Sequence, residues 1–207
     1  MLENLQAWFQ RYFVDNGATS WWLEGLKTTV LVTLLALCIG VVLGFLIAII
    51  RTTHEQTGKL KLLNLLAKIY LTVIRGTPSM IQILIFYSVV FASVNLNNII
   101  IGGIAFGINS GAYVAEIVRS GIMSIDKGQT EAGRSLGLSA VQTLWLIIMP
   151  QAFKNVLPAL INELIVLLKE TAIIGYIGTT DITKAATLVQ SRTYSAFVRS
   201  EEHTSEL

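Results

Sequence analysis

The sequence predicts an all-α membrane protein, and its composition and the length of its apolar runs carry this prediction. Of the 207 residues, 53% are hydrophobic and only 14% are charged, and the mean hydropathy is +0.64. Soluble domains carry about 25% charged residues, so this chain has too few charges to solvate a surface. Several apolar runs reach the ~20 residues that a helix needs to cross a hydrocarbon core of about 30 Å.

Four spanning helices are expected, at residues 28–50, 62–91, 99–122 and 156–177. The first run has no charged residue. The second is interrupted by Lys68 and by the segment Arg75-Gly-Thr-Pro78. Glycines recur at intervals of four in the first run (Gly40 and Gly44) and again in the third. Such spacing places them on one helix face, where two helix backbones can approach closely.

The distribution of lysine and arginine predicts the orientation of these helices. Basic residues gather in the loops that follow the first and third runs, at 51–61 and 119–154. The residues before the first run and the turn at 93–98 carry no such excess. Because short cytoplasmic loops are rich in Lys and Arg, we expect the N-terminus outside and the 124–151 loop in the cytoplasm.

A loop motif lies between the third and fourth runs. Glu131, Ala132 and Gly133 are followed after three residues by Gly137, and after nine more by Ile147-Ile-Met-Pro150. Residues 131–136 suit a short surface helix, and Gly137 suits a left-handed stop. The motif resembles the cytoplasmic loop of ATP-binding-cassette (ABC) importer permeases, with Gly133 replacing an alanine and Met149 a leucine. The resemblance implies a coupling helix docked on an ATPase subunit. Without it, these residues would suit an ordinary amphipathic helix.

Further segments resemble one branch of these permeases, the binding-protein-dependent importers of polar amino acids of the histidine, glutamine and arginine type. They are Arg75-Gly-Thr-Pro78, Asn109-Ser-Gly-Ala-Tyr-Val-Ala-Glu116, Pro150-Gln-Ala, Leu157-Pro, Asn162-Glu163 and Leu168-Lys-Glu-Thr171. The resemblance implies the transmembrane domain of a type I ABC importer with five spans in the bacterial inner membrane. It also implies an ATPase subunit that holds ATP and Mg²⁺, a second permease subunit, identical or homologous, and an extracytoplasmic amino-acid-binding protein.

The expected domain organisation follows from this resemblance. Residues 1–25 form an amphipathic extracytoplasmic segment, and residues 26–198 form the permease domain. Residues 199–207 resemble the translation of a DNA-sequencing adapter and are expected to be an artefact. The fifth span is then expected to be lost after residue 198.

A carboxylate within the fourth run is a candidate for the substrate pathway. Charges are costly in a bilayer, so Glu163 is expected to face the bundle interior and to meet a substrate ammonium. An ion pair with a basic residue of another helix is the alternative. Asn162, its neighbour, points about 100° away in a regular helix, so both residues line one cavity only if the site is wide or distorted.

Structural and pathway roles are both expected among the other polar residues at membrane depth. Glu116 and Arg119 are three residues apart and are expected to form a structural ion pair. Pro78, preceded by Gly76, should kink the second helix. Carbonyls freed at such a break are tolerated where they line a cavity, so two nearby polar residues are pathway candidates unless the kink is purely structural. These are Thr77 and Gln82.

The chain offers almost no residues for enzymatic chemistry. It contains no Gly-x4-Gly-Lys-Ser/Thr phosphate loop, no His-Glu-x-x-His metal motif and no Gly-x-Ser-x-Gly elbow. No catalytic residue, metal or cofactor is therefore expected in this chain, nor is nucleic acid a partner. The alternatives to an amino-acid importer are an ABC permease for another solute, such as an osmolyte, and an ATP-independent channel or ion-coupled transporter.

Overall fold

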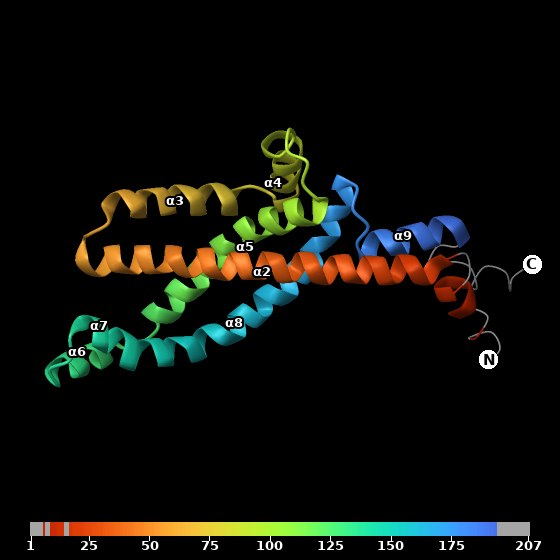
Figure 1. Cartoon of the computed structure of the whole chain (residues 1–207). Coiled ribbons are helices and arrows are strands. Elements are labelled where there is room, and N and C mark those ends of the chain that lie inside the picture. The colour runs from red at the N-terminus through yellow and green to blue at the C-terminus, as the bar shows by residue number, and fades with distance from the viewer. Residues whose placement is uncertain (1–5, 7–8, 15–16, 194–207) are drawn as a thin grey trace, which may run out of the picture.

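The fold is a bundle of helices built around one long helix. The structure, a computed structural model, describes residues 6, 9–14 and 17–193. Helix α2 (Ala18–Thr57) runs through the length of the molecule, and α5 (Asn98–Met123) and α8 (Met149–Glu170) cross it (Figure 1). Helix α3 (Lys61–Gly76) lies along its C-terminal half, and α9 (Ile182–Thr193) packs beside its first turns.

Shorter helical segments complete the described part of the chain. They are the π-helical turn η1 (Gln10–Val14), α4 (Ser79–Ile85) with its π-helical continuation η3 (Phe86–Val90), α6 (Lys127–Ser135), α7 (Ala140–Thr143), the π-helical η4 (Leu144–Ile148) and the 3₁₀ helix η5 (Thr171–Ile177). Residues 199–207, the expected artefact, lie outside the described residues.

The expected spans correspond to helices, but their boundaries differ. Helix α2 has 40 residues, which at 1.5 Å per residue is about 60 Å, twice the hydrocarbon core. Among the described residues, α2 and α5 are each long and apolar enough to cross a membrane, and α3 with α4–η3 makes a third span if that bent pair counts as one.

The expected fourth run is distributed over two elements. Helix α8 begins at Met149, seven residues before the apolar run, and it ends at Glu170, after which η5 continues as a tighter 3₁₀ helix. Four charged residues, Lys154, Glu163, Lys169 and Glu170, keep α8 from being apolar throughout. Helix α9 was not predicted, because the residues that form it have mixed polarity.

Close packing of α2 against α5 confirms the expectation from the glycine spacing. A Cβ atom on Gly44 would lie 2.5 Å from the Val114 side chain, and one on Gly107 would lie 2.6 Å from Ile39. Real Cβ atoms do not approach other atoms so closely, so only glycine allows the two backbones this separation. The main buried clusters line this contact and extend to α4, α8 and η5. They contain Val32, Ala36, Ile83, Ala105, Phe106, Leu167, Ile174 and Ile177 in one half, and Ala48, Val114, Val118, Ile122, Ile148, Ala152 and Val156 in the other.

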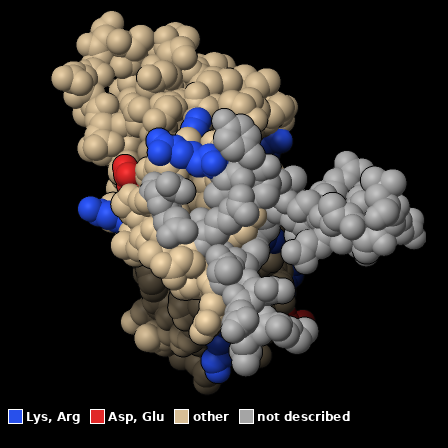
Figure 2. Space-filling view, turned by 90° about the vertical axis from the view of Figure 1, so that its right-hand side faces the viewer, with Lys and Arg blue, Asp and Glu red and all other residues tan. Residues whose placement is uncertain are grey.

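An uncharged lobe projects from the bundle. It comprises α4, η3 and the turn before α5, and residues 79–98 include no Lys, Arg, Asp or Glu. Figure 2, which faces the end of the molecule that carries the termini, shows this lobe as an uncharged projection above the charged residues around α2 and α9. Exposed Val89 and Val90 add apolar surface to the lobe.

Candidate functional site

The second expected span breaks sharply at Gly76–Pro78. Helices α3 and α4 differ in direction by 108°, which is far more than the kink that a proline alone predicts. Pro78 has no N–H to donate to the carbonyl of Ile74, its partner in a continuous helix. The Gln82 side chain takes that place, because its Nε2 donates to Ile74 O at 2.7 Å.

Gln82 also ties the break to the neighbouring helix. Its Nε2 reaches the carbonyl and the hydroxyl oxygens of Thr77, at 3.0 and 2.7 Å, and its Oε1 accepts from Asn109 of α5 at 2.9 Å. Gln82 is buried, whereas Thr77, Gly76 and Pro78 are exposed. The hydrogen-bonding capacity of Gln82 is therefore used within the protein. Of the two pathway candidates at the break, Gln82 and Thr77, only Thr77 remains accessible.

Glu163 lies buried between α8 and α5. Ser110 donates its hydroxyl to Glu163 Oε1 at 2.8 Å, and no Lys or Arg of the described residues lies within ion-pair distance of this carboxylate. Ser110 itself sits where Gly40 lets α2 approach α5. Asn162 is exposed on a different face of α8, as the angle of about 100° between successive residues requires.

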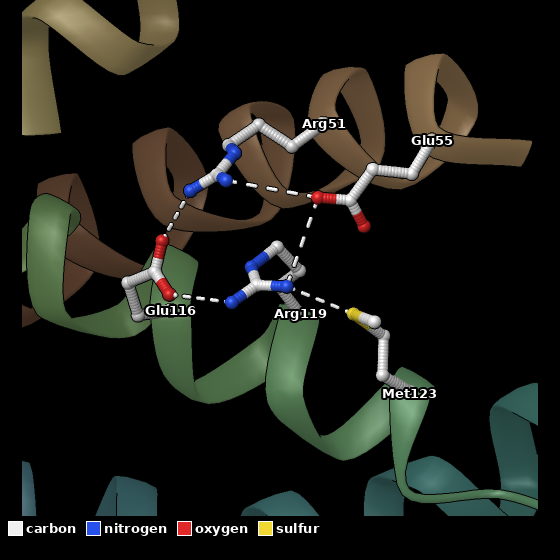
Figure 3. A network of polar contacts seen from close by, with 5 residues as sticks. All are labelled: Arg51, Glu55, Glu116, Arg119 and Met123. Atoms are coloured by element: carbon white, nitrogen blue, oxygen red, sulfur yellow. Dashed lines mark hydrogen bonds and ion pairs between the residues drawn. The ribbon is translucent and has the colours of Figure 1, made fainter. Parts of the chain in front are cut away.

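Four charged side chains form a closed network between α2 and α5 (Figure 3). Arg119 Nη2 lies 2.9 Å from Glu116 Oε2, and Arg51 of α2 bonds to the other oxygen of Glu116. Glu55 lies 3.6 Å from Arg51 and 3.7 Å from Arg119. The sequence predicted the pair on α5 but missed its partners on α2. Their spacing of four residues at the end of the first span was the available signal.

The loop between α5 and α8 forms a compact helical hairpin. Helix α6 begins at Lys127 rather than at residue 131, because Asp126 caps it by accepting the N–H of Gly128 at 2.6 Å. Its end follows the expected pattern, since Gly137 has φ +83°. The N–H groups of Gly137 and Leu138 return to the carbonyls of Arg134 and Gly133, at 3.0 and 3.2 Å, as in a Schellman motif.

The two glycines of the loop motif have different roles in this hairpin. A Cβ on Gly133 would lie 2.7 Å from Thr143 Cγ2, so this position lets α6 sit directly on α7 and η4. Gly137 has open space around it and is required for its backbone conformation. Glu131 and Ala132 are exposed, and Leu136 is 80% exposed at the end of α6. The hairpin therefore presents a surface with both polar and apolar side chains.

A cavity of about 710 Å³, open to the surface, lies between α5 and α8 and has Arg75 in its wall. Its walls include Ser120 of α5, Ser124, which directly follows α5, and Asn155 of α8. No group of three or more His, Cys, Asp or Glu side chains suited to a metal ion occurs in the part of the chain that the structure describes.

These features define a helical membrane protein with a buried carboxylate in its bundle and a capped helical hairpin at one end. The sequence pattern of the family "Binding-protein-dependent transport system inner membrane component" matches residues 40–197, and the chain belongs to this family. It is thus an inner-membrane permease component of an ABC transporter, which decides against a stand-alone channel or ion-coupled transporter.

Individual relatives share most of the chain. A Rickettsia conorii protein named as a glutamine transport system permease is 40% identical over 176 residues, which are 84% of this chain and 78% of that protein. The arginine transport system permease ArtQ of Bacillus subtilis is 35% identical over 175 residues, with the same shares of the two chains. The Escherichia coli K12 glutamine permease GlnP is 35% identical over 165 residues, covering 78% of this chain and 73% of that one.

Solved structures support the type I ABC importer fold. A crystal structure of an amino acid ABC transporter with histidines has a TM-score of 0.79 and 42% identity, covering 90% of this chain and 85% of its own. An inward-facing methionine transporter, MetNI, has a TM-score of 0.71 at 16% identity, covering 87% and 93% of the two chains, and shares the fold alone.

Proposed function

We propose that this permease imports polar amino acids and that Glu163 binds the ammonium group of the substrate. The relatives described above are named as permeases for glutamine or arginine, which supports this class of solute. The observation that carries the proposal is the buried carboxylate itself. Intramembrane charges usually pair with one another, yet Glu163 accepts only a hydroxyl hydrogen bond from Ser110 among the contacts of the described residues. A substrate ammonium would supply the missing positive charge.

Two other polar residues belong to this proposal at the edges of the pathway. Thr77 is exposed at the break between α3 and α4, and Asn162 is exposed one residue before Glu163. Since they lie on different helices and Asn162 is on a different face from Glu163, we assign them contacts with passing substrate rather than places in one pocket. Gln82 stabilises the break and has no spare donor for substrate. The Thr77 hydroxyl donates to Val73 O at 2.8 Å, so Thr77 would contact substrate as a hydrogen-bond acceptor.

The hairpin of α6 and α7 is proposed to couple the permease to a separate ATPase subunit. Exposed Glu131, Ala132 and Leu136 would contact the ATPase, while Gly133 and Gly137 give the hairpin its shape. ATP and Mg²⁺ would be held by that subunit. ATP-driven closure of two ATPases would then move the hairpin and switch the bundle between inward- and outward-facing states. A second permease subunit and an external binding protein complete the proposed assembly.

The proposed orientation places α6 and α7 in the cytoplasm and the N-terminus outside. The end of the molecule that carries these helices has more basic than acidic residues, and Arg119 and Glu116 of the network there add one of each sign to the others. The others are Arg51, Lys59, Lys61, Lys127, Arg134 and Lys154 against Glu55, Asp126 and Glu131. An excess of this sign is typical of cytoplasmic loops.

Uptake by the complete complex in proteoliposomes tests the proposed substrate class and the role of Glu163. The wild-type complex should accumulate glutamine or arginine in an ATP-dependent manner, and Glu163→Gln should reduce uptake at least about tenfold, because a neutral amide loses the charge-assisted bond. Glu24→Gln, which changes an exposed carboxylate at the start of α2, should retain wild-type uptake. Accumulation of an osmolyte but no amino acid would instead favour a permease for another solute.

A further inference from the structure

Arg75 lies near Glu116 of the charged network but forms no ion pair with it in the described part of the chain. It lies in the last turn of α3, at the break, and its guanidinium carbon lies 5.4 Å from the centre of the Tyr113 ring on α5. Within the described residues, Arg51 and Arg119 share Glu55 and Glu116, whereas Arg75 forms no ion pair. The guanidinium group instead lies over the Tyr113 ring in a cation–π contact.

Arg75 forms part of the wall of two cavities. The cavity of about 710 Å³ described above lies between α5 and α8, and one of about 320 Å³ lies between α2 and α3, with Arg51 and Lys68 in its walls. Glu116 lines both. Every carboxylate of the network is already shared between two arginines, so Arg75 and Lys68 add positive charge that the network does not neutralise. The surroundings therefore favour an anion.

The larger cavity reaches to within about one helical turn of Glu163 along α8. Ala159, in its wall, precedes Glu163 by four residues and so shares its face of α8. Ile117, also in its wall, follows Ser110 by seven residues and shares its face of α5. From there the cavity extends along α5 and α8 to Ser124 and Asn155, near the end of the bundle that carries α6 and α7.

We infer that Arg75 forms a binding site for the α-carboxylate of the amino acid. The substrate would reach this site after Glu163, on its way toward the α6–α7 end. This inference rests on the proposed function, since it concerns the same substrate. An arginine fork matches a carboxylate with two parallel hydrogen bonds. The substrate would first place its ammonium on Glu163 and then its carboxylate on Arg75 as it moves along the cavity. The permease would thereby recognise the zwitterion common to all amino acids.

Competition binding to the detergent-solubilised complex of permease and ATPase, without the binding protein, tests this inference. The probe is radiolabelled glutamine or arginine, and the competitors are the same amino acid and its α-carboxamide, which lacks the carboxylate. The wild-type complex should prefer the amino acid at least about tenfold, as expected for a bond between charged groups. Arg75→Gln should weaken binding of the amino acid by the same factor and leave binding of the amide unchanged, so that the preference disappears.

Two further variants separate recognition from stability and from general charge. Arg75→Lys keeps the charge but loses the two-pronged geometry, and it should show an intermediate preference, so that the test stands even if Arg75→Gln fails to fold. Lys154→Gln removes an exposed positive charge of α8 outside the cavity and should keep the full preference. A folded Arg75→Gln or Arg75→Lys complex with the wild-type preference would overturn the inference alone. A wild-type complex that transports no amino acid would overturn the proposed function as well.

Discussion

At the scale of single residues, the break between α3 and α4 shows how one side chain replaces a missing backbone donor. Pro78 leaves the carbonyl of Ile74 without its helical partner, and Gln82 supplies an amide N–H from eight residues along the chain. The Oε1 atom of the same Gln82 amide accepts a hydrogen bond from Asn109. The proline permits the bend, but the hydrogen bonds of Gln82 fix its direction relative to α5.

Replacing Gln82 with leucine should therefore destabilise the protein. Gln82→Leu leaves the carbonyl of Ile74 and the amide of Asn109 without these partners, and each buried unsatisfied group costs about 1–3 kcal/mol. We expect a loss of roughly 2–4 kcal/mol in the free energy of unfolding, measured by denaturant titration in detergent. Asn95→Leu, an amide replacement in the exposed turn before α5, should change it by less than about 0.5 kcal/mol. Equal effects of the two changes would contradict this account of the break.

The charged network illustrates a different residue-scale effect. Arg51 and Glu116 are 65 residues apart, and their side chains are only partly exposed. Because each arginine of the network contacts both carboxylates, the cluster joins α2 to α5 near the α6–α7 end while leaving no net charge among its four members (Figure 3).

At the scale of helices, the contact between α2 and α5 depends on glycines from both partners. The side chains of Ser110 and Val114 pack against Gly40 and Gly44 of α2. Those of Leu35 and Ile39 pack against Gly103 and Gly107 of α5. In lipid there is no hydrophobic force between helices, so such close packing supplies much of the association.

A larger side chain within this contact should separate the helices. Gly107→Leu would place its Cβ 2.6 Å from Ile39, and overpacking of this kind costs about 1–3 kcal/mol or more. A lower midpoint of thermal unfolding, followed by size-exclusion chromatography after heating, is the expected result. Gly76→Leu makes the same replacement where nothing lies within 4 Å of a Cβ, and it should leave the midpoint nearly unchanged. If both variants unfolded alike, close packing of α2 and α5 would not explain the loss.

The α6–α7 hairpin makes its own prediction about partners. Leu136 is 80% exposed, so its replacement by aspartate should not disturb folding, yet it would put a charge into the proposed ATPase contact. Leu136→Asp should abolish co-purification of the cognate ATPase subunit with the tagged permease. Val94→Asp, the same type of change in the exposed turn before α5, should retain it. Retention of the ATPase by both variants would argue against docking through the end of α6.

At the scale of the whole molecule, α2 organises the arrangement of the other helices. It contacts α3, α5, α8 and α9 (Figure 1). With 40 residues, α2 is longer than the roughly 20 residues that cross a hydrocarbon core. Its two ends therefore reach both sides of the membrane. One end carries the charged network and lies near the α6–α7 hairpin, and the other packs on α9.

The orientation of the molecule can be measured with single cysteines in a Cys38→Ala background. A cysteine at Lys127, in the first turn of α6, should react with a membrane-impermeant maleimide only after cells are opened, because the basic end is expected in the cytoplasm. A cysteine at Val94 should react in intact cells. The opposite pattern would reverse the proposed orientation.

The sequence by itself determined the features that depend on local chemistry. Apolar runs indicated the long helices, Pro78 indicated the break, Gly137 indicated the end of α6, and the pattern Glu131-Ala-Gly with Gly137 indicated the permease family. The long helices follow from the thickness of a bilayer, and the break and the end of α6 follow from backbone geometry, so neighbouring residues are enough to predict them. The family followed from the resemblance of the motif to that of known permeases. Helix boundaries were less accurate, because caps such as Asp126 act outside the periodic pattern.

Only the tertiary structure decided which polar groups meet across the bundle. Ser110 reaches Glu163 from 53 residues away, Asn109 reaches Gln82, and Arg51 reaches Glu116. The sequence placed each of these residues on a helix but could not give the rotation of that helix against its neighbours. That rotation is set by the close fit of glycines against side chains of α2 and α5. Since a polar group at membrane depth must find a partner within the protein, the packing of the helices also selects which groups remain available for substrate.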